Sequence, residues 1–318
     1  MTADLTLPLD LVRRSERADP IDGRRLKRAV DSGEWVRVVP GVFASSREWR
    51  RLLPLERHRV RVIETMRRLP APATFVLHAA AAIWRMDVLG RWPAQVDVAV
   101  RSSGGARSSG TVRRHAVDPR GLALLPVGRH FVTTPAQTAV DLALTLPHVV
   151  AVTAIDQSLW DRRRGGALTT RDELRRVQAA NSHRRGHARA GRAIAAAEDG
   201  AANVRETEAR LELIRLGFPR PRLQERRILR TGRLVYGDMY FPEADHWLEV
   251  DGDGKYVSPE YTGGRSPEEI VIDEKNRENE IRREVRGFSR LGPKDAGRPR
   301  LLYDILTFDG LRSILPRP

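Results

Sequence analysis

The pattern of apolar and polar residues indicates strands in the C-terminal part of the chain. The segments RLVYGDMYF, at 233–241, and WLEVDG, at 247–252, are joined by the polar loop PEADH. Alternation with a period of two places successive side chains on opposite faces of a sheet. The sequence therefore predicts a hairpin, with a further strand before the Thr231-Gly232 turn. The side chains expected on one face are Tyr236, Asp238, Tyr240, Trp247, Glu249 and Asp251.

A helical pattern precedes this hairpin, in NVRETEARLELIRLGFPRP at 203–221. Asn203 is a suitable N-cap, and Gly217 ends the helix. Glu206 follows Asn203 by three residues, which is the spacing of a capping box, in which a glutamate only satisfies a backbone amide. The buried face is expected to hold Leu213, Ile214 and Leu216.

The N-terminal pattern predicts two helices and a hairpin. Residues 9–16 fit a short helix, and GRRLKRAVDSG, at 23–33, fits a second helix that Gly33 ends. EWVRVVPGVFAS, at 34–45, predicts two strands around Pro40-Gly41. This order is that of a winged helix-turn-helix, which puts a basic helix in the major groove, and a small lobe with a solvated basic face is the alternative. The residues expected to contact DNA here are Arg24, Arg25, Lys27, Arg28 and Arg37.

Residues 75–145 combine helix and strand signals. His78 is expected to cap a helix, and QVDVAVR, at 95–101, alternates as a strand. Thr134-Pro135 begins another helix, with proline at the first helical position. Asp141 lies inside that helix, where we expect an internal ion pair with an arginine.

Length and composition limit the class of protein. With 318 residues the chain exceeds one ordinary core, so two or three domains are expected. The chain has no cysteine, which excludes disulfides and thiolate metal sites and fits a reducing compartment. The sequence shows no secretory pattern and no apolar run of membrane-spanning length, so we expect a cytoplasmic location and no membrane partner.

The net charge of +15 is concentrated in the first 200 residues. They hold 34 Lys and Arg against 20 Asp and Glu, whereas residues 201–318 hold 22 against 21. Residues 161–192 alone carry ten arginines against three acids and predict a helical basic connector. Such an excess favours a nucleic acid as partner, most simply double-stranded DNA. The alternative is that the arginine excess reflects the codon bias of a GC-rich genome, because only four of the 56 basic residues are lysine.

The N-terminal half resembles a known family. LKRAVDSGEWVRVVPGVF, at 26–43, resembles the N-terminal winged-helix domain of the AbiEi family of type IV antitoxins. VLHAAAAIWRMDVLG, at 76–90, and FVTTPAQTAVDLAL, at 131–144, are similar to segments that follow that domain in many proteins. The resemblance implies DNA binding, autoregulation and a cognate toxin as partner. It implies no catalytic residue.

The carboxylates of the C-terminal hairpin could form a metal site or belong to an exposed turn. If Asp238 lies near Glu249, then Asp238, Glu249 and Asp251 converge on one patch. Like charges this close raise one another's pKa values unless a cation lies among them. Hard oxygen ligands suit Mg²⁺ or Mn²⁺, so the pattern predicts a divalent-metal site. The alternative is an exposed hairpin that ends in the turn DGDG, and for Asp253 alone the turn is the preferred interpretation.

The C-terminal region resembles the PD-(D/E)XK nuclease superfamily, and within it the small domain related to very-short-patch mismatch-repair (Vsr) endonucleases. The similarity spans 203–307, from ETEARLELIRLGFPRP through Gln224, Asp238 and EVDG at 249–252. EKNRENEIRREVRG, at 274–287, matches a later helix of that family, and its strand-borne arginine falls on Arg290, which we expect to contact DNA.

This second resemblance implies metal-dependent phosphodiester hydrolysis. Asp238 and Glu249 would hold the metal, joined by Asp251 or Glu206, and Lys255 or Lys275 would assist the attacking water. The sequence departs from the family where Glu-x-Asp replaces Glu-x-Lys, so the lysine must come from elsewhere.

The expected fold is therefore α+β and multidomain. A winged helix-turn-helix is expected at 1–50, a central α/β region at 51–150, a basic helical connector at 151–200 and a restriction-endonuclease-like domain at 201–318. Three functions remain open. The first is a metal-dependent DNA endonuclease, the second is a non-catalytic DNA-binding regulator or antitoxin with a degenerate nuclease fold, and the third is a structural partner of a toxin.

Overall fold

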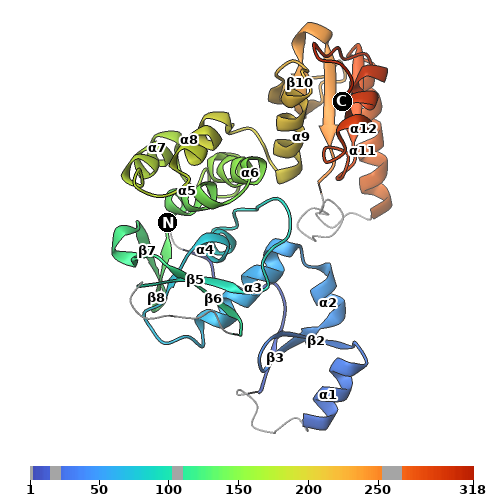
Figure 1. Cartoon of the computed structure of the whole chain (residues 1–318). Helices are drawn as coiled ribbons and strands as arrows, with labels where there is room; N and C mark the ends of the chain where they lie inside the picture. The colour runs from blue at the N-terminus through green and yellow to red at the C-terminus, as the bar shows by residue number, and fades with distance from the viewer. Residues whose placement is uncertain (1–2, 15–22, 102–109, 253–266) are drawn as a thin grey trace. The chain divides into compact units, whose positions relative to one another are not determined.

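The computed structural model describes residues 3–14, 23–101, 110–252 and 267–318. The chain divides into two compact units: unit 1 comprises residues 1–158 and 168–195, and unit 2 comprises 159–167 and 196–318. The described residues form three sheets and eleven α-helices, so the protein is of the mixed α+β class (Figure 1). Within the described ranges, no helix has the length and apolar character needed to cross a membrane.

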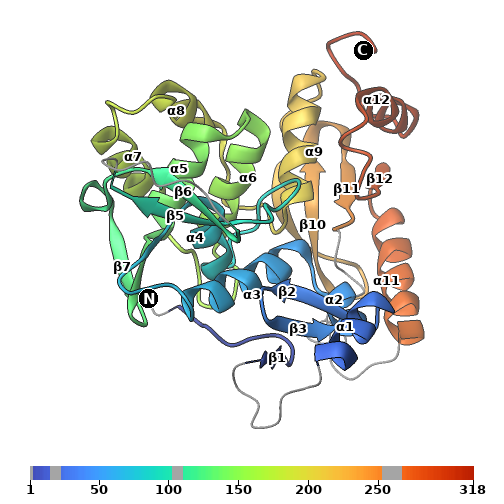
Figure 2. The same cartoon turned by 60° about the horizontal axis from the view of Figure 1, so that its bottom comes forward.

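Unit 1 begins with a three-stranded antiparallel sheet in the order β1-β3-β2 (Figure 2). Its strands are β1 (Val12–Arg13), β2 (Trp35–Val39) and β3 (Val42–Ser45). Helix α1 (Gly23–Asp31) precedes β2, and α2 (Ser46–Arg51) and α3 (Pro54–Met66) follow β3. The predicted basic helix and hairpin are thus confirmed. Val38, Val42 and Trp49 belong to the core of this part, and α3 contributes Val60.

The helix predicted at 9–16 is wrong for the residues described. Val12 and Arg13 are extended and pair with Phe43 and Val42 of β3. The physical reason lies in the preceding residues, where leucines occur at 7, 9 and 11 and pack half-buried against the hairpin core. A period of two is that of a strand, and the prediction overlooked it.

A five-stranded sheet, in the order β6-β5-β4-β8-β7, forms the rest of the unit 1 framework. The β4–β8 and β5–β6 pairs are parallel, and the other two pairs are antiparallel. The strands are β4 (Thr74–Phe75), β5 (Val96–Val100), β6 (Val112–Ala116), β7 (Leu124–Val127) and β8 (His130–Thr133). A 3-10 turn, η2 (Pro119–Gly121), links β6 to β7.

Five helices accompany this sheet: α4 (Leu77–Ile83), α5 (Pro135–Thr145), α6 (His148–Leu159), α7 (Arg171–Ala180) and α8 (His187–Ala196). Thr134 caps α5 by accepting a hydrogen bond from the amide of Gln137, as its sequence predicts. His78 does not cap a helix, because α4 already begins at Leu77 and His78 lies inside it. Residues 151–200, taken as a connector in the sequence, are largely helical and are divided between the two units.

Unit 2 contains a four-stranded sheet in the order β12-β11-β10-β9, in which β11 and β12 are parallel and the other pairs antiparallel. The strands are β9 (Arg222–Ile228), β10 (Leu234–Phe241), β11 (His246–Val250) and β12 (Gly287–Leu291). The turn η3 (Pro242–Ala244) closes the predicted hairpin. The helices are α9 (Val204–Arg215), α11 (Pro267–Arg282) and α12 (Pro299–Phe308).

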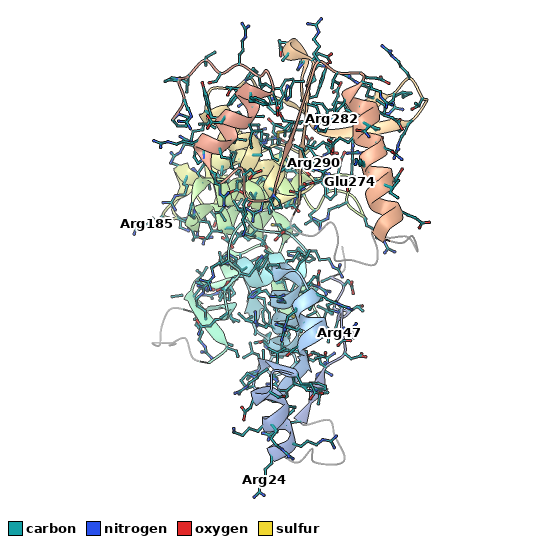
Figure 3. The ribbon with its side chains drawn as sticks, turned by 90° about the vertical axis from the view of Figure 1, so that its right-hand side faces the viewer. Arg24, Arg47, Arg185, Glu274, Arg282 and Arg290 are labelled. Carbon is teal, nitrogen blue, oxygen red and sulfur yellow. The ribbon has the colours of Figure 1, made fainter. Side chains whose placement is uncertain are left out.

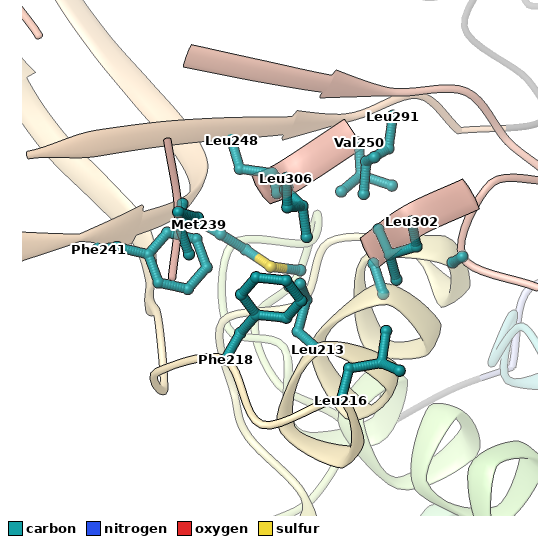
Figure 4. Packing of buried hydrophobic residues seen from close by; sticks show 13 residues of the cluster. Leu213, Leu216, Phe218, Met239, Phe241, Leu248, Val250, Leu291, Leu302 and Leu306 are labelled. Carbon is teal, nitrogen blue, oxygen red and sulfur yellow. The ribbon is translucent and has the colours of Figure 1, made fainter. Parts of the chain in front are cut away.

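Two apolar clusters hold the helices of unit 2 on opposite sides of the sheet. Alternate residues Met239, Phe241, Leu248 and Val250 pack with α9 and α12 (Figure 4). Residues of the opposite parity, such as Tyr240 and Trp247, pack with Ile281 of α11. The core follows the period-two pattern of the strands, as expected for a sheet covered on both faces.

One part of the hairpin departs from simple alternation. A Cβ atom on Gly237 would lie 2.2 Å from Cε2 of Trp247, so Gly237 rather than Tyr236 faces the indole ring. Opposite this point, Gln224 has a φ of 48° and the β9–β10 register skips the pair of residues 224 and 238. Within β10, Val235 packs in the cluster of Trp247 whereas Met239, of the same parity, packs in the cluster on the other side of the sheet. The predicted common face of Tyr236, Asp238 and Tyr240 is therefore wrong.

Candidate functional site

The first candidate site is the basic face of α1 in unit 1. Its apolar face is anchored by Leu26, which is 6% exposed. The four predicted DNA-contacting side chains of this helix are all exposed, and so is that of Arg37 on β2. Figure 3 shows Arg24 pointing outward at the end of this region. Arg47 of α2, which sequence reasoning missed, is also exposed but lies well apart from Arg24 in that view. One of the four, Lys27, pairs with Asp31 one turn away.

The second candidate site is the carboxylate group of unit 2. Asp238 and Glu249 come close together in the β10–β11 hairpin, because the adjacent pair Met239 and Leu248 is in register. The carboxylate of Asp238 accepts a hydrogen bond from the backbone amide of Val250 at 2.8 Å. Its other oxygen lies 3.5 Å from Nε2 of Gln224. Asp238 thus takes part in the hydrogen-bonding of the sheet itself.

Glu249 is buried and held by two donors. Trp247 Nε1 donates to one carboxylate oxygen at 2.9 Å, and Arg277 of α11 donates to the other. Arg277 was not identified from the sequence as a site residue, although it lies within the segment that resembles the nuclease family. A guanidinium in this position neutralises the charge that a metal would otherwise compensate.

Asp251 is held in the same manner by Arg290. Nε and Nη2 of Arg290 donate to its two oxygens at 3.0 and 2.8 Å. Arg290 also donates to Glu274 at 2.9 Å and to Glu278 at 3.0 Å, so one guanidinium joins three carboxylates. Figure 3 labels Arg290 and Glu274. The hydrogen bond to Asp251 raises the pKa of Arg290 above its ordinary value. Arg290, which the sequence predicts to contact DNA, lies in an ion-pair network in this structure.

The three remaining predicted site residues have different surroundings. Glu206 satisfies a backbone amide, as the capping-box alternative proposed, but this amide belongs to Ala202, at 2.8 Å, the residue before the N-cap. Its carboxylate also accepts from the Asn203 side chain. It also lies 3.4 Å from Gln224 Nε2, which links it to Asp238. Lys275 is exposed on α11. Lys255, like Asp253, lies outside the described residues.

A divalent-metal site requires carboxylates that converge. Among the described residues, no three His, Cys, Asp or Glu side chains form a group that could hold a metal ion. Glu249 and Asp251 instead direct oxygens at Arg277 and Arg290. In this arrangement the predicted ligands Asp238, Glu249 and Asp251 do not fit a resident Mg²⁺ or Mn²⁺.

A further group of ionisable residues, which the sequence did not indicate, lies in unit 1 around fully buried Asp97. Arg113 Nε donates to this carboxylate at 2.6 Å, and His115 Nε2 lies 2.8 Å from it. His78 Nδ1 lies 3.5 Å from the second oxygen. Buried His58 stands nearby, its ring 5.3 Å from that of Trp92, and burial lowers its pKa to about 3. These residues come from four elements and loops far apart in the chain, so only the fold brings them together.

Comparison with known proteins assigns no family. No family model matches the chain, and no curated protein matches it. Two chains of solved structures match. One of them belongs to the crystal structure of the RV2827C protein from Mycobacterium tuberculosis, with a TM-score of 0.32 and 16% identity over 58% of this chain and 71% of that chain. A TM-score this low supports no conclusion about the fold or the function of this chain.

Proposed function

We propose that the protein binds double-stranded DNA through a winged helix-turn-helix made of β1, α1 and the β2–β3 hairpin, and that it acts as a non-catalytic regulator. The observation that carries this proposal is the exposed basic face of α1. This nine-residue helix turns Leu26 inward and four cationic side chains outward. A helix that reads the major groove needs such a face for phosphates and base edges.

The ion pairs of unit 2 support the non-catalytic part of the proposal. We propose that unit 2 is a PD-(D/E)XK-like fold, because its hairpin is followed by a parallel strand and helices lie on both sides of the sheet. In it, Glu249 and Asp251 are neutralised by Arg277 and Arg290. Together with Glu-x-Asp in place of Glu-x-Lys, this favours binding over turnover. A cognate toxin is a further proposed partner and rests on the AbiEi resemblance alone.

Fluorescence anisotropy with duplexes selected from a random library tests the DNA-binding proposal. The Arg25→Ala/Arg28→Ala double variant is expected to lose roughly tenfold or more in affinity, because each lost base or phosphate contact weakens binding. Arg312→Ala, an exposed arginine of unit 2, is the matched control and is expected to bind like the wild type. Wild-type protein that binds no duplex at low salt, or a double variant that binds as well as the control, would overturn the proposal.

A metal-dependent DNA endonuclease is the second candidate. The observation in its favour is the chain of contacts from Glu206 through Gln224 to Asp238, which gathers residues of α9, β9 and β10 beside Glu249. For this function, Arg277 and Arg290 must release their carboxylates when DNA and a divalent ion bind.

Cleavage of supercoiled and mismatched duplex DNA separates the two candidates. The wild type is compared with Asp238→Asn, Glu249→Gln and the control Glu243→Gln, which changes an exposed glutamate in η3. Cutting that needs Mg²⁺ or Mn²⁺, stops with EDTA, is lost in the first two variants and persists in the control would establish the endonuclease. Intact DNA in every reaction, with binding retained, supports the regulator.

A further inference from the structure

The helical pair α7–α8 of unit 1 carries a basic surface separate from α1. Exposed arginines stand at 175 and 176 on α7, at 185 in the connecting loop and at 189 and 192 on α8. Helix α8, HARAGRAIAA, contains no acidic residue. Arg189 and Arg192 are three residues apart and share one helix face. The opposite face is apolar, with Ala190, Ala193 and Ile194 buried.

The loop that presents Arg185 is fixed on both sides. Arg184 forms an ion pair with Asp141 of α5, whose side chain is 4% exposed, and donates to Asn181 at 3.1 Å. Gly186 has a φ of 94°, and a Cβ atom there would lie 2.2 Å from the carbonyl oxygen of Leu144. The loop therefore packs directly on the C-terminal end of α5, and Arg185 lies between two anchored neighbours.

The helix that carries Arg189 and Arg192 is also fixed. Gln178 of α7 lies between His187 and Gly191 of α8, with its Nε2 3.0 Å from His187 Nε2. Arg189 donates to the carbonyl oxygen of Thr145 at 3.3 Å. In the part of the chain that the structure describes, Arg185, Arg189 and Arg192 form no ion pair with a carboxylate. Their positive charge is thus held on a rigid support and faces solvent.

The chemistry of this surface fits a phosphate backbone better than a protein or a membrane. The planar fork of a guanidinium group matches phosphate oxygens and loses less rotamer freedom for each hydrogen bond formed than a lysine does, and here the backbone that carries it is already fixed. A protein or membrane partner usually needs large apolar anchors. Among the described residues, none of the exposed large hydrophobic side chains belongs to residues 168–196.

We infer that Arg185, Arg189 and Arg192 form a second, sequence-independent contact to the phosphate backbone of duplex DNA. The inference rests on the proposed DNA-binding function and extends it with residues outside the winged-helix region. In this scheme α1 supplies discrimination between sequences, and the α7–α8 arginines supply affinity that depends on salt.

The test is the salt dependence of DNA binding by the full chain, measured by fluorescence anisotropy. Replacing all three arginines by alanine is expected to make the slope of log affinity against log salt shallower by about 2.7, at about 0.9 for each lost phosphate contact. The ratio of affinities for selected and random duplexes should stay unchanged, since no base contact is removed. The corresponding triple lysine variant keeps the charges and should keep most of the slope.

A charge-matched control replaces Arg283, Arg298 and Arg312, three exposed arginines of unit 2, by alanine. If this control and the α7–α8 variant have the same slope, the inference is overturned and the proposed function stands. If the wild type binds no duplex, the proposed function fails and the inference fails with it. Circular dichroism confirms that both triple variants are folded before binding is measured.

Discussion

The surfaces of unit 1 that we propose to bind DNA differ from the carboxylate group of unit 2 in how their arginines are held. In unit 1 the cations of α1 and of the α7–α8 pair face solvent, whereas in unit 2 Arg277 and Arg290 are held by carboxylates. The net charge follows the same division, with 34 basic against 20 acidic residues up to residue 200 and 22 against 21 beyond it. An arginine that forms no ion pair in the described structure, such as Arg185, is available to a partner, whereas one held by a carboxylate, such as Arg290, stabilises the fold. The count of arginines alone therefore does not locate a binding surface.

The largest expected effect on the free energy of unfolding comes from Asp97, a fully buried carboxylate of unit 1. Asp97→Ala leaves Arg113 and His115 without their carboxylate, and removing one member of a buried pair costs about 3 to 5 kcal/mol. Because Arg113 is 39% exposed and regains some water, we expect the lower end of that range. Urea unfolding measures the change. A loss below about 0.5 kcal/mol, typical of a surface site, would show that this network does not hold unit 1 together.

Acid should weaken unit 1 through His58. Burial is the main cause of its lowered pKa of about 3, and the charges of Arg61 and His78 act in the same direction, while Asp97 opposes them. Because the folded value lies below the unfolded value of about 6.5, the stabilisation is complete above pH 6.5 and is lost as the pH falls toward 3. At pH 5 the loss is about 2 kcal/mol. Urea titrations between pH 7 and 5 measure this slope.

His58→Phe is the matched control for the pH effect, since it keeps a ring against Trp92 and removes the titrating group. The variant is expected to show a flatter pH dependence than the wild type above pH 4. Below that value Asp97 adds its own loss, because its hydrogen bonds with His115, His78 and Arg113 outweigh burial and lower its pKa. Equal slopes for variant and wild type would exclude His58 as the titrating group.

Arg290→Ala tests whether the paired arginines of unit 2 are structural. The variant leaves three carboxylates, Asp251, Glu274 and Glu278, without their shared cation. We expect a loss of about 2 kcal/mol, less than for a fully buried pair because the Arg290 side chain is 28% exposed. Thermal unfolding of the variant and the wild type measures this loss of stability. If DNA affinity falls while stability is unchanged, Arg290 is a DNA contact as the sequence suggested.

Arg25→Ala provides the smallest stability effect and completes the comparison. Its side chain is exposed on α1, so the free energy of unfolding should change by less than about 0.5 kcal/mol. DNA affinity should fall nevertheless, which is the reverse of the result expected for Arg290→Ala. A marked loss of stability would place Arg25 among the structural arginines and remove the contrast between α1 and the carboxylate group of unit 2.

Local signals in the sequence were sufficient for most of the secondary structure. The α1 helix, the β2–β3 hairpin, the Thr134 cap and the β10–β11 hairpin follow from caps, turns and periodicity over a few residues. The strand β1 was missed because its pairing partner lies about thirty residues away, at Val42 and Phe43. The short alternation of leucines before it was the available signal.

The contacts of the carboxylate group in unit 2 were harder to predict from the sequence, because its carboxylates pair with residues far away along the chain. That Asp238 and Glu249 are neighbours follows from the hairpin, but the pairing of Glu249 with Arg277 depends on how α11 packs on the sheet. The change of face near Gly237 lies opposite Gln224 of another strand, whose left-handed backbone the local sequence does not indicate. Asp97 and its histidines are a further case, since they lie on separate elements.

The hydrogen bond from Val250 to Asp238 makes one amide proton a reporter of the carboxylate. Because Val250 is 1% exposed and its amide donates to this side chain at 2.8 Å, its exchange with deuterium is slow as long as the bond persists. If Asp238 turns toward a metal and DNA, that proton is released and exchanges faster. Deuterium exchange at the Val250 amide therefore shows whether Asp238 stabilises the sheet or binds a metal during catalysis. The measurement does not require any cleavage product to form.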